Sequence, residues 1–243
     1  MIKTALVTGG ARRLGRAMVE AVHAQGLNVM IHCNRSTDEA HQLANELNDV
    51  RTESAHVVQA NLTQDDRANA ILEDTLTAFG RLDLLINNAS TFYPTPLGNI
   101  TNDDWNDLLG SNLKAPLMLS QACASSLRSH HGAIVNLIDI YAERPLLSYS
   151  TYCAAKAGLA SLTRSLAIEL APDIRVNGIA PGAMLWPENP DHPLDENQLV
   201  ERIPLRRLGG ATDIAKATVF LGLETNYITG QILNVDGGRS IVN

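Results

Sequence analysis

The sequence predicts an α/β protein with a doubly wound, seven-stranded parallel sheet. Two observations predict this class: short β-rich runs recur along the 243 residues, and segments with apolar residues three and four positions apart alternate with them. Such alternation is typical of parallel strands joined by crossover helices. A chain of this length and class commonly forms one core, so we expect a single domain over residues 1–243.

The individual elements follow from local patterns. Strands are expected at 4–8, 28–32, 55–59, 82–86, 133–137, 175–179 and 231–235. Helices are expected at 14–25, 38–48, 65–79, 113–128, 151–171 and 212–223. Ser36 followed by Glu39 has the pattern of a capping box, which predicts a helix start there. Residues 184–193 hold three prolines that disfavour a regular element, so we expect a substrate lid within residues 183–200.

Composition excludes several classes of protein. The net charge of −7, without a dense Lys or Arg run, disfavours a nucleic-acid-binding surface. No apolar stretch approaches the roughly 20 residues that span a bilayer, and the N-terminus leads directly into a strand, so a cytoplasmic protein is expected. Three widely spaced cysteines, Cys33, Cys123 and Cys153, fit neither a disulfide framework nor a metal site, and we expect reduced thiols.

A glycine-rich turn separates the first strand from the first helix. It reads Thr-Gly-Gly-Ala-Arg-Arg-Leu-Gly over residues 8–15. Glycines permit close approach of the backbone to a phosphate, and a helix N-terminus attracts negative charge. An ordinary strand-to-helix turn is the alternative, but the position after the first strand of an alternating fold favours a dinucleotide site.

The end of the second strand indicates which dinucleotide binds. A carboxylate that would hydrogen-bond the adenosine ribose of NAD is absent from residues 32–36, which read His-Cys-Asn-Arg-Ser. Arg35 can pair with a 2′-phosphate, Ser36 can donate a hydroxyl, and Arg12 or Arg13 can add charge. NADPH is therefore expected in preference to NADH. The alternative is a solvated Arg35 beside a Ser36 that only caps the helix.

Tyr152 and Lys156 lie four residues apart and therefore on one face of the expected helix 151–171. A nearby cation favours a phenolate, so we expect Lys156 to bring the pKa of Tyr152 down toward neutral pH for proton transfer. Lys156 could also hydrogen-bond the nicotinamide ribose. The pattern alone is weak, because many such pairs are ordinary surface neighbours.

Together these motifs resemble the short-chain dehydrogenase/reductase family over nearly the whole chain. The matching features are the turn at 8–15, Asn87-Asn88-Ala89, Asn112, Tyr152 with Lys156, Pro181-Gly182 and Asp236-Gly237-Gly238. The resemblance implies a Rossmann-type fold, and it implies that Asn112 positions a water and Lys156 for proton relay. Asn61-Leu62 occupies the place where the family usually has Asp near the adenine. The resemblance to the family further implies a homotetramer in which helices 113–128 and 151–171 lie at an interface between subunits. The apolar faces of these helices could instead be buried within one subunit.

Three departures from the family pattern narrow the expected substrate. Arg13 replaces a glycine of the turn, Ser90 replaces a common glycine, and Asp139 stands where the family has its catalytic Ser. A carboxyl can help protonate a basic ring nitrogen, which a Ser hydroxyl cannot. These departures, with the run 87–97, resemble the pteridine reductases. That resemblance implies that Phe92 stacks on a flat pterin, with Arg13 and Ser90 contacting both ligands. Alternatives are a loop anchor for Phe92 and a turn cap for Asp139.

The expected site therefore consists of three groups of residues. The catalytic group is Asp139, Tyr152, Lys156 and Asn112. The cofactor group is Gly9, Arg13, Leu14, Gly15, Asn34, Arg35, Ser36, Asn61, Leu62, Asn88, Ala89, Ser90, Tyr152, Lys156, Pro181 and Gly182. The substrate group is Arg13, Ser90, Phe92, Asp139, Tyr152 and Met184, with Leu185 or Trp186 as further apolar wall.

NADPH-dependent reduction of a pterin ring C=N bond, from dihydropterin to tetrahydropterin, is the function expected from these residues, with dihydrofolate or oxidised pterins as further substrates. A carbonyl reductase, such as a 3-oxoacyl thioester reductase, is the alternative within the same fold. A non-catalytic NADPH sensor is a third hypothesis, which the Asn112, Tyr152 and Lys156 set disfavours because a sensor needs no proton relay. No metal is expected to take part.

Overall fold

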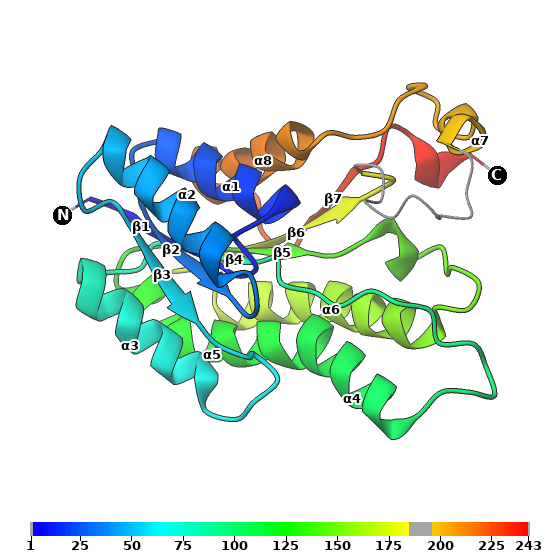
Figure 1. The fold of residues 1–243 in the computed structure, drawn as a ribbon, viewed down its shortest axis with the longest axis horizontal. Coiled ribbons are helices and arrows are strands. Elements are labelled where there is room, and N and C mark those ends of the chain that lie inside the picture. Colours follow the sequence, from blue (N-terminus) through cyan, green and yellow to red (C-terminus); the bar gives the residue numbers. More distant parts are fainter. Residues whose placement is uncertain (1, 185–195, 243) are drawn as a thin grey trace.

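A computed structural model describes residues 2–184 and 196–242, and its core is one parallel seven-stranded sheet in the order β3-β2-β1-β4-β5-β6-β7 (Figure 1). The strands are β1 (Thr4–Val7), β2 (Asn28–Cys33), β3 (Ala55–Gln59), β4 (Leu84–Asn87), β5 (Ala133–Leu137), β6 (Arg175–Pro181) and β7 (Ile232–Val235). The predicted α/β, Rossmann-type doubly wound sheet is confirmed. The fourth strand begins two residues later than predicted.

Helices cover both faces of the sheet. They are α1 (Arg13–Ala24), α2 (Thr37–Val50), α3 (Arg67–Phe79), α4 (Asn102–Leu109), α5 (Ala115–Arg128), α6 (Ser150–Glu169), α7 (Glu196–Glu201) and α8 (Ala211–Val219). Side chains of α1, α2 and α8 share one buried cluster with the sheet, and those of α3, α5 and α6 share another on the opposite face. Because both faces are covered, the central strands are apolar at nearly every position.

Two helices were not predicted from the sequence. Helix α4 begins at a capping box in which Thr101 accepts from the Asp104 amide while the Asp104 carboxylate accepts from the Thr101 amide. That Thr-x-x-Asp signal was present in the sequence, but only eight residues follow it, and α7 is shorter still. The π-helical turn Gly110–Lys114 joins α4 to α5 without a break in the helical backbone, so Asn112 lies in a π turn inside one continuous helical segment.

The capping box predicted at Ser36 is wrong. Ser36 is the residue before α2, but its side chain makes no cap hydrogen bond. Its ψ of 55° departs from the extended backbone that normally directs an N-cap hydroxyl at the first turn. The Ser36 hydroxyl is therefore not used by the helix.

No helix within the described ranges 2–184 and 196–242 is both long enough and apolar enough to cross a membrane. Of the lid predicted within residues 183–200, residues 185–195, with Leu185 and Trp186, lie outside the described residues, and residues 196–200 belong to helix α7. Met184 forms a parallel bridge with Gly209 and packs against the core cluster of α1, α2 and α8.

Candidate active site

A cleft of about 680 Å³ opens at the carboxyl ends of β1, β2 and β4. The strand order reverses between β1 and β4, which is where open parallel sheets bind their ligands. The cleft is lined by Gly9, Ala11, Arg12, Arg13, Leu14, Gly15, His32, Cys33, Asn34, Arg35, Ser36, Asn61, Leu62, Thr63, Asn88, Ala89, Ser90, Thr91, Tyr93, Asp107 and Ser111. It therefore contains every predicted cofactor residue except Tyr152, Lys156, Pro181 and Gly182.

The turn at residues 8–15 is held in place from the end of β4. The Asn88 side-chain amide donates to the carbonyl oxygens of Thr8 (2.8 Å) and Gly9 (3.0 Å). The Thr8 hydroxyl accepts from the backbone amides of Asn88 (2.9 Å) and Ala89 (3.0 Å). A Cβ on Gly15 would overlap the Gly9 carbonyl oxygen, so only glycine fits that position. Asn88 therefore fixes the shape of the glycine turn by hydrogen bonds and also lines the cleft.

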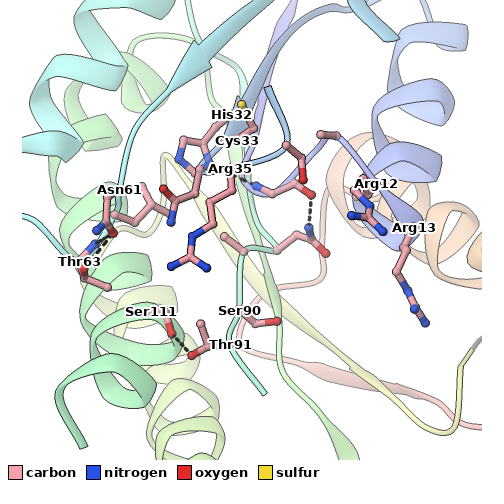
Figure 2. A pocket seen from close by; sticks show the side chains of 18 of the residues that line it. Arg12, Arg13, His32, Cys33, Arg35, Asn61, Thr63, Ser90, Thr91 and Ser111 are labelled. Atoms are coloured by element: carbon pink, nitrogen blue, oxygen red, sulfur yellow. Dashed lines mark hydrogen bonds between the residues drawn. The ribbon is translucent and has the colours of Figure 1, made fainter. Parts of the chain in front are cut away.

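Arg13 has a backbone conformation that normally favours glycine. Its φ of 51° lies in the left-handed region, which costs a non-glycine residue about 1–2 kcal/mol. Helix α1 begins at this residue, and its first turn holds no acidic side chain that would compete with a phosphate. The cradle thus fits a dinucleotide pyrophosphate, with Arg13 projecting from its edge (Figure 2).

Arg35 extends from the end of β2 into the middle of the cleft, whereas Arg12 and Arg13 lie together on the other side of it (Figure 2). Arg12 faces Glu39, with 3.6 Å between its Nη1 and a carboxylate oxygen. No acidic side chain of residues 2–184 or 196–242 pairs with Arg35, which is exposed beside the uncommitted Ser36 hydroxyl. This geometry suits an additional phosphate beside Arg35 and Ser36.

His32 is a buried member of this site that the sequence reasoning missed. The Gly9 amide donates to its Nδ1 (3.2 Å), and its Nε2 lies 3.0 Å from the Ala60 carbonyl oxygen. The first contact requires an unprotonated Nδ1, so the second is an Nε2–H donor to Ala60. His32 therefore joins the glycine turn to the opposite rim of the cleft. A histidine in a strand carries no sequence signal for such a role.

We expect His32 to make the protein sensitive to acid. Burial lowers its pKa from 6.5 to about 4. Between these values the unfolded chain binds a proton that the folded chain does not. The contribution of His32 to the free energy of unfolding is therefore fully present above pH 6.5. As the pH is lowered from 6.5 to about 4, the free energy of unfolding decreases by up to about 1.4 kcal/mol per pH unit.

The measurement is urea unfolding at pH 7 and pH 4.5 for the wild type and His32→Asn. The Asn side chain keeps an acceptor near Gly9 but does not titrate, so its loss of stability in acid should be about 2 kcal/mol smaller. Equal losses in the two proteins would show that His32 does not contribute.

The second part of the site lies at the end of β5. The Tyr152 hydroxyl donates to Oδ2 of Asp139 at 2.8 Å, and Oδ1 of Asp139 accepts from the Tyr141 amide at 2.9 Å. Asp139 therefore is a turn cap, as the structural alternative proposed, and is at the same time in direct contact with Tyr152. Burial raises the pKa of the Asp139 carboxyl despite these hydrogen bonds, so it retains a proton more readily than an ordinary Asp.

Lys156 is buried and donates to the Leu137 carbonyl oxygen at 2.8 Å. Its Nζ lies 5.7 Å from the centre of the Tyr152 ring, and burial lowers its pKa to about 8. The prediction that Lys156 brings the pKa of Tyr152 down is wrong in this structure. Burial raises the pKa of Tyr152, and the charge of Asp139 raises it further, so the phenol stays protonated as a donor.

Phe92 packs against Tyr152 on the solvent-facing side of the site. Its ring stacks on Tyr149 with 4.6 Å between centroids and meets Tyr152 edge-on at 4.8 Å, yet about half of it (52%) is exposed. It is therefore not a loop anchor buried in the core. Asn112 lies behind, where its side-chain amide donates to the carbonyl oxygens of Thr91 (3.0 Å) and Leu108 (2.9 Å). Its Oδ1 is buried and has no hydrogen-bond partner among the described residues.

The remaining predicted residues border the site less closely. Pro181 ends β6, and the Gly182 amide donates to Val235. Ser90 is exposed and lines the cleft. Tyr93 and Asp107 also line it, joined by a 3.2 Å hydrogen bond from the Tyr93 hydroxyl. Asp107 could not be found from the sequence because its helix, α4, was not predicted.

Known proteins are similar to this chain over nearly its whole length. A family model described as enoyl-(acyl carrier protein) reductase matches residues 9–240. The chain is 37% identical to pteridine reductase 1 of Leishmania tarentolae, over 98% of this chain and 96% of that protein. It is 34% identical to the 3-oxoacyl-[acyl-carrier-protein] reductase FabG of Staphylococcus epidermidis (98% and 99%), and 35% identical to FabG of Staphylococcus aureus (98% and 98%). The matched residues include both parts of the site.

Proposed function

The chain belongs to the short-chain dehydrogenase/reductase family of nicotinamide-dependent oxidoreductases, and we propose that it reduces pterins with NADPH. The reaction converts a ring C=N bond of a dihydropterin into CH–NH, and dihydrofolate or oxidised pterins are further candidate substrates. The observation that carries the proposal is the partly buried Asp139 carboxyl, which is hydrogen-bonded to Tyr152, the residue whose ring contacts the half-exposed Phe92.

The chemistry of a C=N bond explains why a carboxyl is useful here. Reduction requires a hydride at carbon and a proton at nitrogen, and NADPH when bound supplies the hydride. Tyr152 and Asp139 share a hydrogen bond and both have raised pKa values, so the pair holds a proton at neutral pH that it can deliver directly or through water. One face of the Phe92 ring is stacked on Tyr149, and we propose that its exposed surface packs against the flat substrate ring, with Arg13, Ser90 and Met184 as further substrate contacts.

The proposed cofactor contacts follow the cleft. The glycine turn and the N-terminus of α1 would hold the pyrophosphate, and Arg35 with Ser36 and Asn34 would hold the 2′-phosphate. Asn61 and Leu62 would border the adenine. Beyond the cleft, Lys156 would contact the nicotinamide ribose, Pro181-Gly182 would border the nicotinamide, and Asn112 would orient a water toward Lys156.

Reduction of a 3-oxoacyl thioester is the second candidate, and the FabG proteins at 34–35% identity favour it. The carboxyl at position 139 argues against it, because a ketone oxygen needs one hydrogen bond from Tyr152 and gains little from a second acid. We also infer a homotetramer with α5 and α6 at a seam. The large apolar side chains of Leu117 on α5 and Ile168 on α6 are exposed in the single chain, which supports this inference.

The proposed function is tested by following NADPH oxidation with dihydrobiopterin, dihydromonapterin, dihydrofolate and an acetoacetyl thioester. We expect a kcat/KM for at least one dihydropterin that exceeds the thioester value at least about 100-fold, corresponding to about 2.7 kcal/mol of selective transition-state binding. Turnover of the thioester without any pterin activity would overturn the substrate assignment and would leave the reductase assignment intact.

We expect Arg35→Ala to abolish the preference for NADPH. A hydrogen bond to a charged group contributes about 1.5–3 kcal/mol, so the Kd for NADPH should rise about 10- to 100-fold while the Kd for NADH stays unchanged. Fluorescence titration of both cofactors measures this. Arg12→Ala is the matched control, with a smaller expected effect because Arg12 faces Glu39. An equal weakening of both cofactors by Arg35→Ala would contradict a 2′-phosphate contact.

A further inference from the structure

Asp107 is the only acidic side chain among the described residues that line the cleft. A carboxylate is costly in a cleft that is proposed to accept a dinucleotide with three phosphate groups, because it repels them. Asp107 reaches the lining from α4, where its carboxylate accepts from Tyr93 and its backbone carbonyl accepts from Ser111. A negative charge retained there calls for a specific positive or hydrogen-donating part of the ligand.

Asn61 cannot supply the acceptor that this rim of the cleft needs. Its side-chain oxygen accepts from both the amide (3.1 Å) and the hydroxyl (2.9 Å) of Thr63. Two such bonds use both lone pairs of an amide oxygen, so Asn61 presents only its NH₂ group to a ligand. Asn61 can therefore donate to a ring nitrogen of a purine, but it does not accept from an exocyclic amine.

Asp107 is held ready to accept. Oδ2 receives the Tyr93 hydroxyl at 3.2 Å, and burial followed by the charge of Asp107 raises the pKa of Tyr93 to about 12, so this phenol remains a donor. The Ser111 hydroxyl donates to the Asp107 carbonyl oxygen at 2.8 Å and lies 2.7 Å from the Thr91 hydroxyl, a contact drawn in Figure 2. Within the described part of the chain, Oδ1 of Asp107 has no donor and keeps its full acceptor capacity.

We propose that Asp107 accepts a hydrogen bond from the exocyclic amine of the cofactor's adenine, so that α4 selects a 6-aminopurine over a 6-oxopurine. The inference rests on the proposed binding of NADPH in this cleft. Tyr93 is the positioning residue that orients the carboxylate, and Asn61 provides the complementary donor. The contact would make the identity of the base, independently of the 2′-phosphate, a determinant of cofactor affinity.

The test compares the Kd of NADPH with that of its hypoxanthine analogue, in which a carbonyl oxygen replaces the amine, by fluorescence titration without substrate. The wild type should bind NADPH at least about tenfold more tightly, because two oxygens would face each other in the analogue. Asp107→Asn should abolish or reverse this preference, since its NH₂ group can donate to the carbonyl. Asp103→Asn makes the same change at an exposed position of the same helix and should keep the wild-type ratio.

The outcomes separate this inference from the proposed function. A wild type that binds neither cofactor contradicts the proposed function, whereas tight NADPH binding with an unchanged base preference in Asp107→Asn overturns the inference alone. Asp107→Asn should also leave the ratio of NADPH to NADH affinity as in the wild type. If that variant does not fold, Tyr93→Phe decides: a reduced base preference supports the role of Asp107, and an unchanged preference overturns it.

Discussion

Replacing Tyr152 by Phe should lower kcat for a dihydropterin about 1,000-fold while the Kd for NADPH changes little. The phenol is the group placed to donate, and general acid catalysis contributes about 10²- to 10⁴-fold. The ring remains buried and keeps its edge-on contact with Phe92, so the change removes only the hydroxyl. Single-turnover oxidation of NADPH by the two proteins measures the effect on the chemical step.

Tyr149→Phe provides the matched control for this prediction. It removes a hydroxyl from the other tyrosine that contacts Phe92, and no hydrogen bond from this hydroxyl is found in the described structure. We therefore expect it to retain kcat within a few-fold of the wild type. A Tyr152→Phe enzyme with nearly full activity would show that Asp139 or water delivers the proton without the phenol.

Replacing Asp139 by Ser should lower the pterin kcat at least about 100-fold, a transition-state loss of about 2.7 kcal/mol. Ser is also a good cap, so it can keep the hydrogen bond from the Tyr141 amide that Asp139 accepts. What it removes is the acidic group in contact with Tyr152. Because a partly buried carboxyl is replaced by a neutral hydroxyl, the fold should tolerate the change.

Asp139→Asn separates the two roles that the carboxyl could have. Asn retains the size and can still hydrogen-bond Tyr152, but its single acceptor oxygen must serve either the Tyr141 amide or the Tyr152 hydroxyl, and it cannot release a proton. Loss of activity in both variants would assign proton delivery to Asp139, whereas activity in Asn but not in Ser would assign it orientation of Tyr152. Full pterin turnover by the Ser variant would contradict any need for the carboxyl.

The sequence predicted the seven strands because alternating short β-rich and longer helical runs leave few other folds. The glycine turn, Arg35, Asp139 and Phe92 could be placed from the sequence because each comes shortly after a strand, and Tyr152 could be placed because it lies in the first turn of a helix with a clear periodic pattern. The prediction from sequence failed for properties that depend on tertiary packing, such as the pKa of a side chain. The pKa of Tyr152 depends on burial and on Asp139, neither of which a spacing of four residues reveals.

The cofactor rim shows the same limit. An Asn side chain can either accept or donate, and only the turn that Asn61 forms with Thr63 removes the first option. His32 and Asp107 come from a strand and an unpredicted helix that the fold brings to one cleft. The capping box at Ser36 failed because residue types alone do not specify a backbone ψ angle.

The hydrogen bonds that fix the glycine turn join protein atoms only. Asn88, Thr8 and His32 tie the turn to β4 and to β2, which lie on either side of β1. These residues are therefore already ordered in the folded protein, so the binding of a dinucleotide does not lose conformational entropy by ordering them. Capture at this end of the cleft should then proceed in one kinetic step whose rate is linear in cofactor concentration, limited by diffusion and orientation rather than by loop closure.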